Sequence, residues 1–314
     1  MKKMEQLRIV FMGTPEFAVA SLDALVKAGC NIVGVITAPD KPGGRGMQLQ
    51  QSAVKKYAVE NNLRVLQPEK LKNAEFLEEL SSLKADLQIV VAFRMLPEVV
   101  WNMPPMGSVN LHGSLLPQYR GAAPINWAVI NGEKETGVTT FKLQHEIDTG
   151  NILMQQSFPI LEEDNVGTVH DRMKEIGATV LVETVKGLAD GSLHERPQLE
   201  MANQPSTALQ HAPKIFTETC QINFNKTVEQ VNNLIRGLSP YPAAFCFLNG
   251  KKLKIFSATI EKAKPTLSAG EFETDKKTFL KFACANGYIK VLDIQLEGKK
   301  RMLTEDFLRG YRFE

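Results

Sequence analysis

The side chains best suited to chemistry in this chain are an amide, an imidazole and a carboxylate. Asn110 and His112 are two residues apart in a short apolar run, so on an extended strand they project from the same face. The glycine that follows ends the run and puts His112 at the carboxyl end of the strand, the edge of a parallel sheet where ligands bind. Imidazole exchanges protons near neutral pH and a carboxamide can donate to an oxyanion, which together suit acyl transfer.

The carboxylate is Asp148, in the turn formed by residues 146–150, and we expect it to orient His112. The alternative for His112 is a histidine that is merely hydrogen-bonded in the core, and spacing alone does not separate the two. A covalent intermediate is not indicated, because the chain has no G-x-S-x-G motif and none of its cysteines neighbours a histidine. Direct displacement by a bound amine is the simpler hypothesis.

Metal and disulfide chemistry are not expected. The five histidines show no H-x-x-x-H or H-E-x-x-H spacing, so no metal site is predicted. The four cysteines are far apart without a C-x-x-C pair, which favours buried free thiols. They are Cys30, Cys220, Cys246 and Cys284.

The elements that must position these side chains form an α/β pattern. Apolar runs typical of buried strands alternate with segments of helical spacing, which predicts a Rossmann-like parallel sheet with right-handed crossovers. The expected strands are residues 8–12, 31–38, 63–66, 86–93 and 108–112, and the expected helices are residues 17–28, 52–62 and 74–83. At the first turn Gly13 is followed by Glu16 rather than by the glycines of G-x-G-x-x-G, so NAD and FAD are excluded.

The second half of the chain changes character. A helix over residues 122–130, strands over 137–143 and 151–158, and a helix over 167–188 complete a catalytic domain of residues 1–190. Polar and proline-rich composition indicates a linker at residues 191–208. Residues 209–314 then form a small OB-like β-barrel domain, with a helix over 228–238 and strands over 244–248, 252–258, 279–283 and 288–296.

Composition and charge limit the partners. The 314 residues are 43% apolar and 23% charged, without an apolar stretch of the ~20 residues that a bilayer requires or a signal-type segment, so we expect a cytoplasmic protein with no membrane partner. Residues 211–314 have a net charge of +6, and the rest of the chain has a net charge of −4. The basic third indicates an anionic partner, although a solvated basic face explains the charge equally well.

Ordered motifs along nearly the whole chain resemble the formyltransferases that use 10-formyltetrahydrofolate. They are FMGTPEFA at 11–18, NLHGSLLP at 110–117, RGAAPI at 120–125 and IDTG at 147–150. The resemblance, greatest to the branch that formylates methionyl-tRNA, implies that an α-amine on initiator tRNA attacks the formyl carbon and forms a tetrahedral intermediate. It assigns oxyanion stabilisation to Asn110 and protonated His112, and orientation of His112 to Asp148.

The same resemblance implies the folate contacts. Side chains after the His112 strand would line the folate site, and the end of the preceding strand would offer backbone groups and an apolar wall to the pterin. These residues are Ser114, Leu115, Leu116, Pro117, Val91, Ala92 and Phe93. Arg94 stands where relatives usually have a glycine.

The resemblance also implies contacts with tRNA. A glycine- and proline-rich loop after the second strand carries Lys41 and Arg45 and would enter the acceptor stem. Basic side chains of the C-terminal domain would contact phosphates: Lys251, Lys252, Lys254, Lys299, Lys300 and Arg301. We expect a monomer, with methionyl initiator tRNA and folate as its partners.

Three other functions stay open. The same polar set could formylate an amino sugar on a nucleotide or hydrolyse the formyl folate, and a noncatalytic RNA- or folate-binding protein could keep the fold. The basic loop and the +6 C-terminal third favour tRNA over a small sugar nucleotide, and a noncatalytic protein would be expected to have lost part of the polar set.

Overall fold

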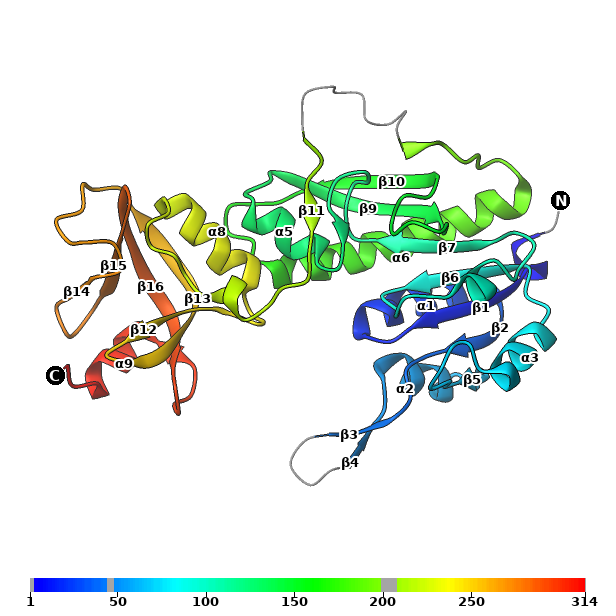
Figure 1. The fold of residues 1–314 in the computed structure, drawn as a ribbon, viewed down its shortest axis with the longest axis horizontal. Helices are drawn as coiled ribbons and strands as arrows, with labels where there is room; N and C mark the ends of the chain where they lie inside the picture. Colours follow the sequence, from blue (N-terminus) through cyan, green and yellow to red (C-terminus); the bar gives the residue numbers. More distant parts are fainter. Residues whose placement is uncertain (1–2, 44–47, 199–207, 314) are drawn as a thin grey trace. The chain divides into compact units, whose positions relative to one another are not determined.

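The chain forms two compact units, seen in the computed structural model of Figure 1, which describes residues 3–43, 48–198 and 208–313. The first unit comprises Met1–Arg120, Gly137–Ser157 and Asp171–Gln210, and the second comprises Gly121–Thr136, Phe158–His170 and His211–Glu314. Two segments from the first two hundred residues therefore pack with the C-terminal unit. Within that unit Asn126 donates from Nδ2 to the Gly237 carbonyl at 2.8 Å, which ties one of these segments to the C-terminal residues.

A seven-stranded sheet forms the first unit (Figure 1). In spatial order its strands are β10 (Ile152–Pro159), β9 (Glu135–Lys142), β7 (Ser108–His112), β6 (Leu87–Val91), β1 (Arg8–Gly13), β2 (Asn31–Ile36) and β5 (Val65–Leu66). The five strands from β7 to β5 are parallel, and β9 runs antiparallel to β7. The mostly parallel, Rossmann-like sheet that the sequence predicts is confirmed.

Five helices lie close to where apolar spacing predicts them: α1 (Glu16–Lys27), α2 (Ala53–Glu60), α3 (Ala74–Ser82), α5 (Pro124–Ile130) and α6 (Val166–Asp190). The one-turn helix α4 (Glu98–Trp101) and the 3₁₀ turn η1 (Met4–Gln6), which precedes β1, are not predicted. Ser52 begins α2, because its hydroxyl accepts a hydrogen bond from the Lys55 amide at 3.0 Å. The strand β6 is buried at all five positions, as expected of a strand covered on both faces.

The turn after β1 is built for close packing. A Cβ on Gly13 would lie 2.6 Å from the Ala18 Cβ and 3.0 Å from the Val91 carbonyl oxygen. Gly13 therefore allows α1 to approach the end of β1 beside β6, which explains this glycine without a phosphate ligand.

A two-stranded hairpin lies in the glycine- and proline-rich loop after β2, where the sequence predicts no secondary structure. It consists of β3 (Lys41–Gly43) and β4 (Gln48–Gln50), paired antiparallel. Two further short strands, β8 (Arg120–Gly121) and β11 (His211–Ala212), were also not predicted. Strands of two or three residues are too short to show an alternating pattern.

In the second unit a curled antiparallel sheet, half of a barrel, packs against α8 (Val228–Leu238). Its strands are β12 (Ala244–Leu248), β13 (Lys251–Glu261), β16 (Gly287–Leu296), β15 (Leu280–Cys284) and β14 (Phe272–Thr274), with β17 (Met302–Leu303) paired to β16. The 3₁₀ turn η2 (Glu218–Cys220) precedes α8, and α9 (Thr304–Gly310) follows β17. A capping box between Thr227 and Gln230 begins α8.

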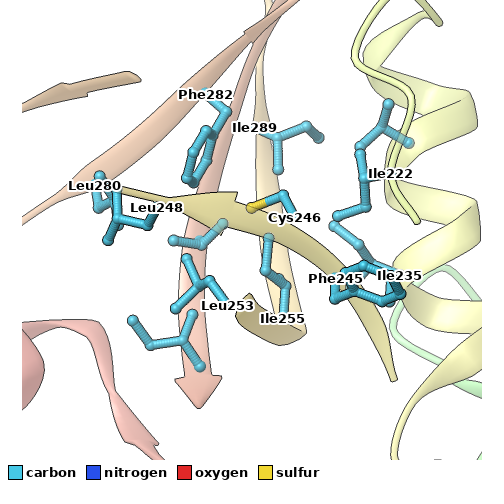
Figure 2. Close-up of a cluster of buried hydrophobic side chains, with 14 of the residues drawn as sticks. Ile222, Ile235, Phe245, Cys246, Leu248, Leu253, Ile255, Leu280, Phe282 and Ile289 are labelled. Atoms are coloured by element: carbon cyan, nitrogen blue, oxygen red, sulfur yellow. The ribbon is translucent and has the colours of Figure 1, made fainter. Parts of the chain in front are cut away.

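The core of this unit lies between the sheet and α8. Figure 2 shows Ile235 from α8 and the side chains of β12, β13, β15 and β16 gathered in one apolar cluster, with Cys246 among them. Burial raises the pKa of the Cys246 and Cys284 thiols to about 12. All four cysteines are free and buried, which confirms the prediction of buried free thiols.

None of the helices formed by the described residues combines the length and apolarity needed to cross a bilayer. The same residues bring no three His, Cys, Asp or Glu side chains together in a way that could hold a metal ion.

Candidate active site

The strand β7, which carries Asn110 and His112, lies between the parallel strand β6 and the antiparallel strand β9. Asn110 pairs with Val90 of the parallel strand β6, and His112 pairs with Thr139 of the antiparallel strand β9. The two side chains therefore stand on one face of the strand, near its carboxyl end, as alternation predicts.

The two nitrogens of the His112 ring face different partners. Its side chain is 7% exposed, and Nε2 lies 2.9 Å from the carbonyl oxygen of Tyr119. Because a carbonyl oxygen only accepts, Nε2 carries a hydrogen. Nδ1 lies 3.8 Å from Asp148 Oδ2, so a second proton on the ring would face this carboxylate across an ion-pair distance. The structure thus brings together the His112 and Asp148 predicted from two distant segments.

The loop that carries Asp148 has a special backbone. Asp148 has a φ of +55°, in the left-handed region that most residues avoid. A Cβ on Gly150 would lie 1.6 Å from the carbonyl oxygen of Lys142, so only glycine lets the loop turn back against β9 here. Thr149 closes the turn by donating from Oγ1 to the Glu146 carbonyl at 3.1 Å. These features hold the Asp148 carboxylate, 11% exposed, against His112.

The Asn110 carboxamide, on the same strand face as His112, is available for a new hydrogen bond. Its side chain is half-buried, and within the described residues its carboxamide forms no hydrogen bond. Asn110 therefore presents an amide donor on the same strand face as the imidazole that faces the Asp148 carboxylate.

The residues predicted to line the folate site form two groups. Ser114 and Leu116 are buried, Ser114 donating from Oγ to the Gln118 carbonyl at 2.6 Å and Leu116 packing with Phe141. Leu115 and Pro117 are half-buried. Leu115 and Pro117 are thus partly accessible, whereas the side chains of the other two support the loop from within.

Thr139 of β9 anchors this loop. Its Oγ1 donates to the Ser114 carbonyl at 2.7 Å and accepts from the Leu116 amide at 3.1 Å. The chain after His112 is therefore tied to the neighbouring strand.

At the end of β6, Val91 is buried, Ala92 is exposed with a φ of +46°, and Phe93 packs into the core of the first unit. Arg94 turns toward another loop: its guanidinium donates to the carbonyl of Pro68 and to that of Glu69 at 2.9 Å. Burial lowers its pKa. Arg94 thus fastens residues 68–69 to the strand end.

The basic loop is only partly described. Lys41 lies in β3, and Arg45 lies outside the described residues. Asp40, at the base of the hairpin, contacts Lys55 Nζ at 2.5 Å and accepts from Gln67 Nε2 at 2.8 Å. The hydrogen bond from Lys55 is the largest cause that lowers the pKa of Asp40. The hairpin is therefore tied to the body of the unit at its base.

Of the six basic residues predicted to contact phosphates in the C-terminal part, three are exposed and three contact other side chains or the backbone. Lys251, Lys299 and Lys300 are exposed. The other three are engaged: Lys252 Nζ lies 4.3 Å from the centre of the Phe245 ring, Lys254 Nζ donates to the Pro242 carbonyl at 3.4 Å, and Arg301 pairs with Asp293 at 2.5 Å and stacks over Phe256. A phosphate at Arg301 would have to compete with Asp293.

Sequence reasoning missed two contributors to the site. The Tyr119 carbonyl that fixes the imidazole belongs to a residue with a φ of +59°, which no local pattern marks. Gln198, from the segment expected to be linker, is buried and donates from Nε2 to the carbonyls of Asp148 and Gly150. Neither contact has a signal in the sequence, because both depend on chain segments brought together by the fold.

The chain matches the family model of formyl transferase over residues 7–185 and that of the formyl transferase C-terminal domain over residues 214–312. Its structure is similar to that of an N-formyltransferase from Helicobacter canadensis in complex with folinic acid and dTDP-3-aminofucose, with a TM-score of 0.68 at 22% identity over 95% of this chain and 100% of that chain. It is also similar to HypX from Aquifex aeolicus in complex with tetrahydrofolic acid, with a TM-score of 0.64 at 17% identity over 96% of this chain and 47% of that chain. These two likenesses concern the fold.

Sequence relatives are much closer. The chain is 55% identical to a methionyl-tRNA formyltransferase from Bacteroides fragilis, over 98% of this chain and 96% of the relative. It is 58% identical to a methionyl-tRNA formyltransferase from Phocaeicola vulgatus, over 98% of this chain and 97% of the relative. Because more than half of the residues are shared along nearly the whole length of both chains, the chain belongs to the methionyl-tRNA formyltransferase family.

Proposed function

We propose that the protein transfers the formyl group of 10-formyltetrahydrofolate to the α-amino group of the methionine carried by initiator tRNA. The observation that carries the proposal is the approach of Asp148 Oδ2 to within 3.8 Å of His112 Nδ1 at the end of β7, with Asn110 on the same face of that strand. Membership of the family indicates the two substrates, and the side chains at the end of β7 suit the transfer of a formyl group between them. We infer a monomer that works in the cytoplasm.

The reaction is a single displacement. The amine nitrogen forms a bond to the formyl carbon, and the carbonyl electrons move to oxygen to give a tetrahedral oxyanion. The bond from that carbon to N10 of the folate then breaks, the amine loses a proton and N10 gains one. No covalent bond to the protein is needed, which agrees with the lack of a nucleophile motif in the sequence.

The proposed roles follow from the hydrogen bonds of the free site. Asn110 donates to the oxyanion from its open carboxamide. His112, with a hydrogen on Nε2 held by Tyr119 and Nδ1 facing Asp148, supplies positive charge beside the oxyanion when its ring is protonated. Asp148 holds the ring in this orientation and balances its charge.

The proposal also includes contacts with the folate and with tRNA. Leu115 and Pro117 are the members of the loop after β7 that are partly accessible, so we place them against the folate, with the backbone of Ala92 opposite. For tRNA, Lys41 and Arg45, four residues apart in the sequence, would approach the acceptor stem. The exposed Lys299 and Lys300 would contact phosphates.

Formylation of methionyl-tRNA by the purified protein, with 10-formyltetrahydrofolate as donor, tests the function. We expect wild type to form the product and His112→Ala to lose most of the rate. His145→Ala is the matched control, because that histidine is 89% exposed and its Nδ1 lies 4.0 Å from the Glu98 carboxylate, away from the His112 ring pair. Equal rates for the wild-type and His112→Ala proteins, or formylation of an amino-sugar nucleotide in place of methionyl-tRNA, would refute the proposal.

A further inference from the structure

We infer that Gln198 is a positioning residue for the reaction, acting through the loop that carries Asp148. This inference rests on the proposed function, because it assigns to Asp148 the support of His112. The side chain of Gln198 is 4% exposed and comes from the segment between α6 and the C-terminal part of the chain.

The carboxamide of Gln198 is fully used. Its Nε2 donates one hydrogen to the Asp148 carbonyl at 2.9 Å and the other to the Gly150 carbonyl at 2.8 Å. Its Oε1 accepts from Nε and Nη2 of Arg120, at 3.2 and 2.6 Å. Carbonyls only accept and a guanidinium only donates, so the amide can take only this orientation. Gln198 thus fastens both sides of the Asp148–Gly150 turn to Arg120.

The segment that presents Gln198 is itself held in place. The amide of Arg196 donates to the Ile152 carbonyl at 2.9 Å, and the amide of Ile152 donates back to the Arg196 carbonyl at 2.8 Å. Next to this bridge Asn151 donates from Nδ2 to Glu195 Oε2 at 3.1 Å. Gln198 is therefore fixed to the start of β10, immediately after the turn that it clamps.

The clamp has a direct consequence for the ion pair. Asp148 has a left-handed backbone, which is unfavourable unless its surroundings impose it. Its Oδ2 lies 3.8 Å from His112 Nδ1, so a small shift of the turn would open the pair. By holding the carbonyls on both sides of Thr149, Gln198 keeps this backbone in the conformation that directs the carboxylate to the ring.

The test compares Gln198→Ala with Gln88→Ala. Gln88 is a matched control, because it is a glutamine of the same unit, 1% exposed, that accepts from Ser108 at the opposite end of β7 from His112. We expect Gln198→Ala to lower kcat roughly 10- to 100-fold, with the KM of each substrate within about twofold of wild type, and Gln88→Ala to leave kcat within about twofold. Gln198→Glu keeps the acceptor for Arg120 but removes both donors, so it should lose kcat to a similar extent.

A double-mutant cycle separates positioning from a general structural effect. If Gln198 acts through Asp148, then Gln198→Ala adds less than about a twofold loss of kcat in a protein that already carries Asp148→Asn. Wild-type kcat in Gln198→Ala, or losses that multiply in the double variant, would overturn the inference. Wild-type kcat in Asp148→Asn would instead overturn the proposed site itself, so the two failures are distinguishable.

Discussion

Gly150→Ala tests how closely the reaction depends on the turn that carries Asp148. The added Cβ would lie 1.6 Å from the Lys142 carbonyl oxygen, whereas a nonbonded carbon and oxygen need about 3.3 Å between them. The turn must therefore move by between about 1 and 2 Å. Asp148 is two residues away and only 3.8 Å from His112 Nδ1, so this movement opens the ion pair.

A displacement of about 1 Å in a catalytic constellation costs on the order of 100-fold in rate, which corresponds to about 2.7 kcal/mol in the activation free energy. We expect Gly150→Ala to lower kcat by that factor, with the KM of each substrate nearly unchanged. Steady-state formylation kinetics and a thermal melt of each protein measure the effect. Gly310→Ala is the control, because nothing lies within 4 Å of a Cβ placed there. A folded Gly150→Ala protein with wild-type kcat would refute the reasoning.

Four further outcomes follow from the geometry. Asn110→Ala removes the open amide donor and should slow turnover by roughly 100-fold, about 3 kcal/mol, in single-turnover assays; a loss below about threefold would exclude an oxyanion role. Replacing Lys299 and Lys300 with alanine should reduce the slope of log affinity for tRNA against log salt by about 1 to 2, whereas the exposed Lys186→Ala should not; unchanged slopes would remove the pair from the interface. The four buried thiols should resist iodoacetamide at pH 8 until the protein is unfolded, as counted by mass spectrometry, and rapid labelling of the native protein would contradict their burial. The pKa of Glu229 is lowered from 4.5 to about 2 by hydrogen bonds from its own backbone amide, Asn286 and Lys262, so its stabilising contribution is complete above pH 4.5 and disappears as the pH falls to about 2. Thermal melts of Glu229→Gln should therefore differ from wild type at pH 7 and converge near pH 2, and a difference that persists in acid would disprove the linkage.

Local pattern predicted most of the framework. The strand Ser108–His112 and the helix Val228–Leu238 lie where apolar spacing places them, because the period of buried side chains follows directly from backbone geometry. The same alternation places Asn110 and His112 on one face. Ser52 begins α2 by a hydrogen bond with a residue only three positions away, so this helix start can be predicted from the local sequence.

Prediction was less complete where elements are short or contacts span the chain. The hairpin of β3 and β4 has three residues in each strand, too few to show a period, and in the curled sheet β14 has three residues and β17 has two. Arg94 could be recognised as unusual, but not that it would bind the carbonyls of residues 68–69. Nothing in the sequence near Arg301 indicates an ion-pair partner, but its guanidinium pairs with Asp293 of the neighbouring strand.

The side chains suited to the proposed chemistry, the face of β7 that carries two of them and the family that the motifs resemble can all be recognised in the sequence. What each of these groups touches depends on the fold. The Tyr119 carbonyl at His112, the Gln198 clamp on the Asp148 turn and the contact that makes Gly150 obligatory all join segments that are separate in the chain. Periodicity is a property of neighbouring residues, whereas the partners of a buried polar group depend on which distant backbone the packing of the sheet brings within hydrogen-bond distance.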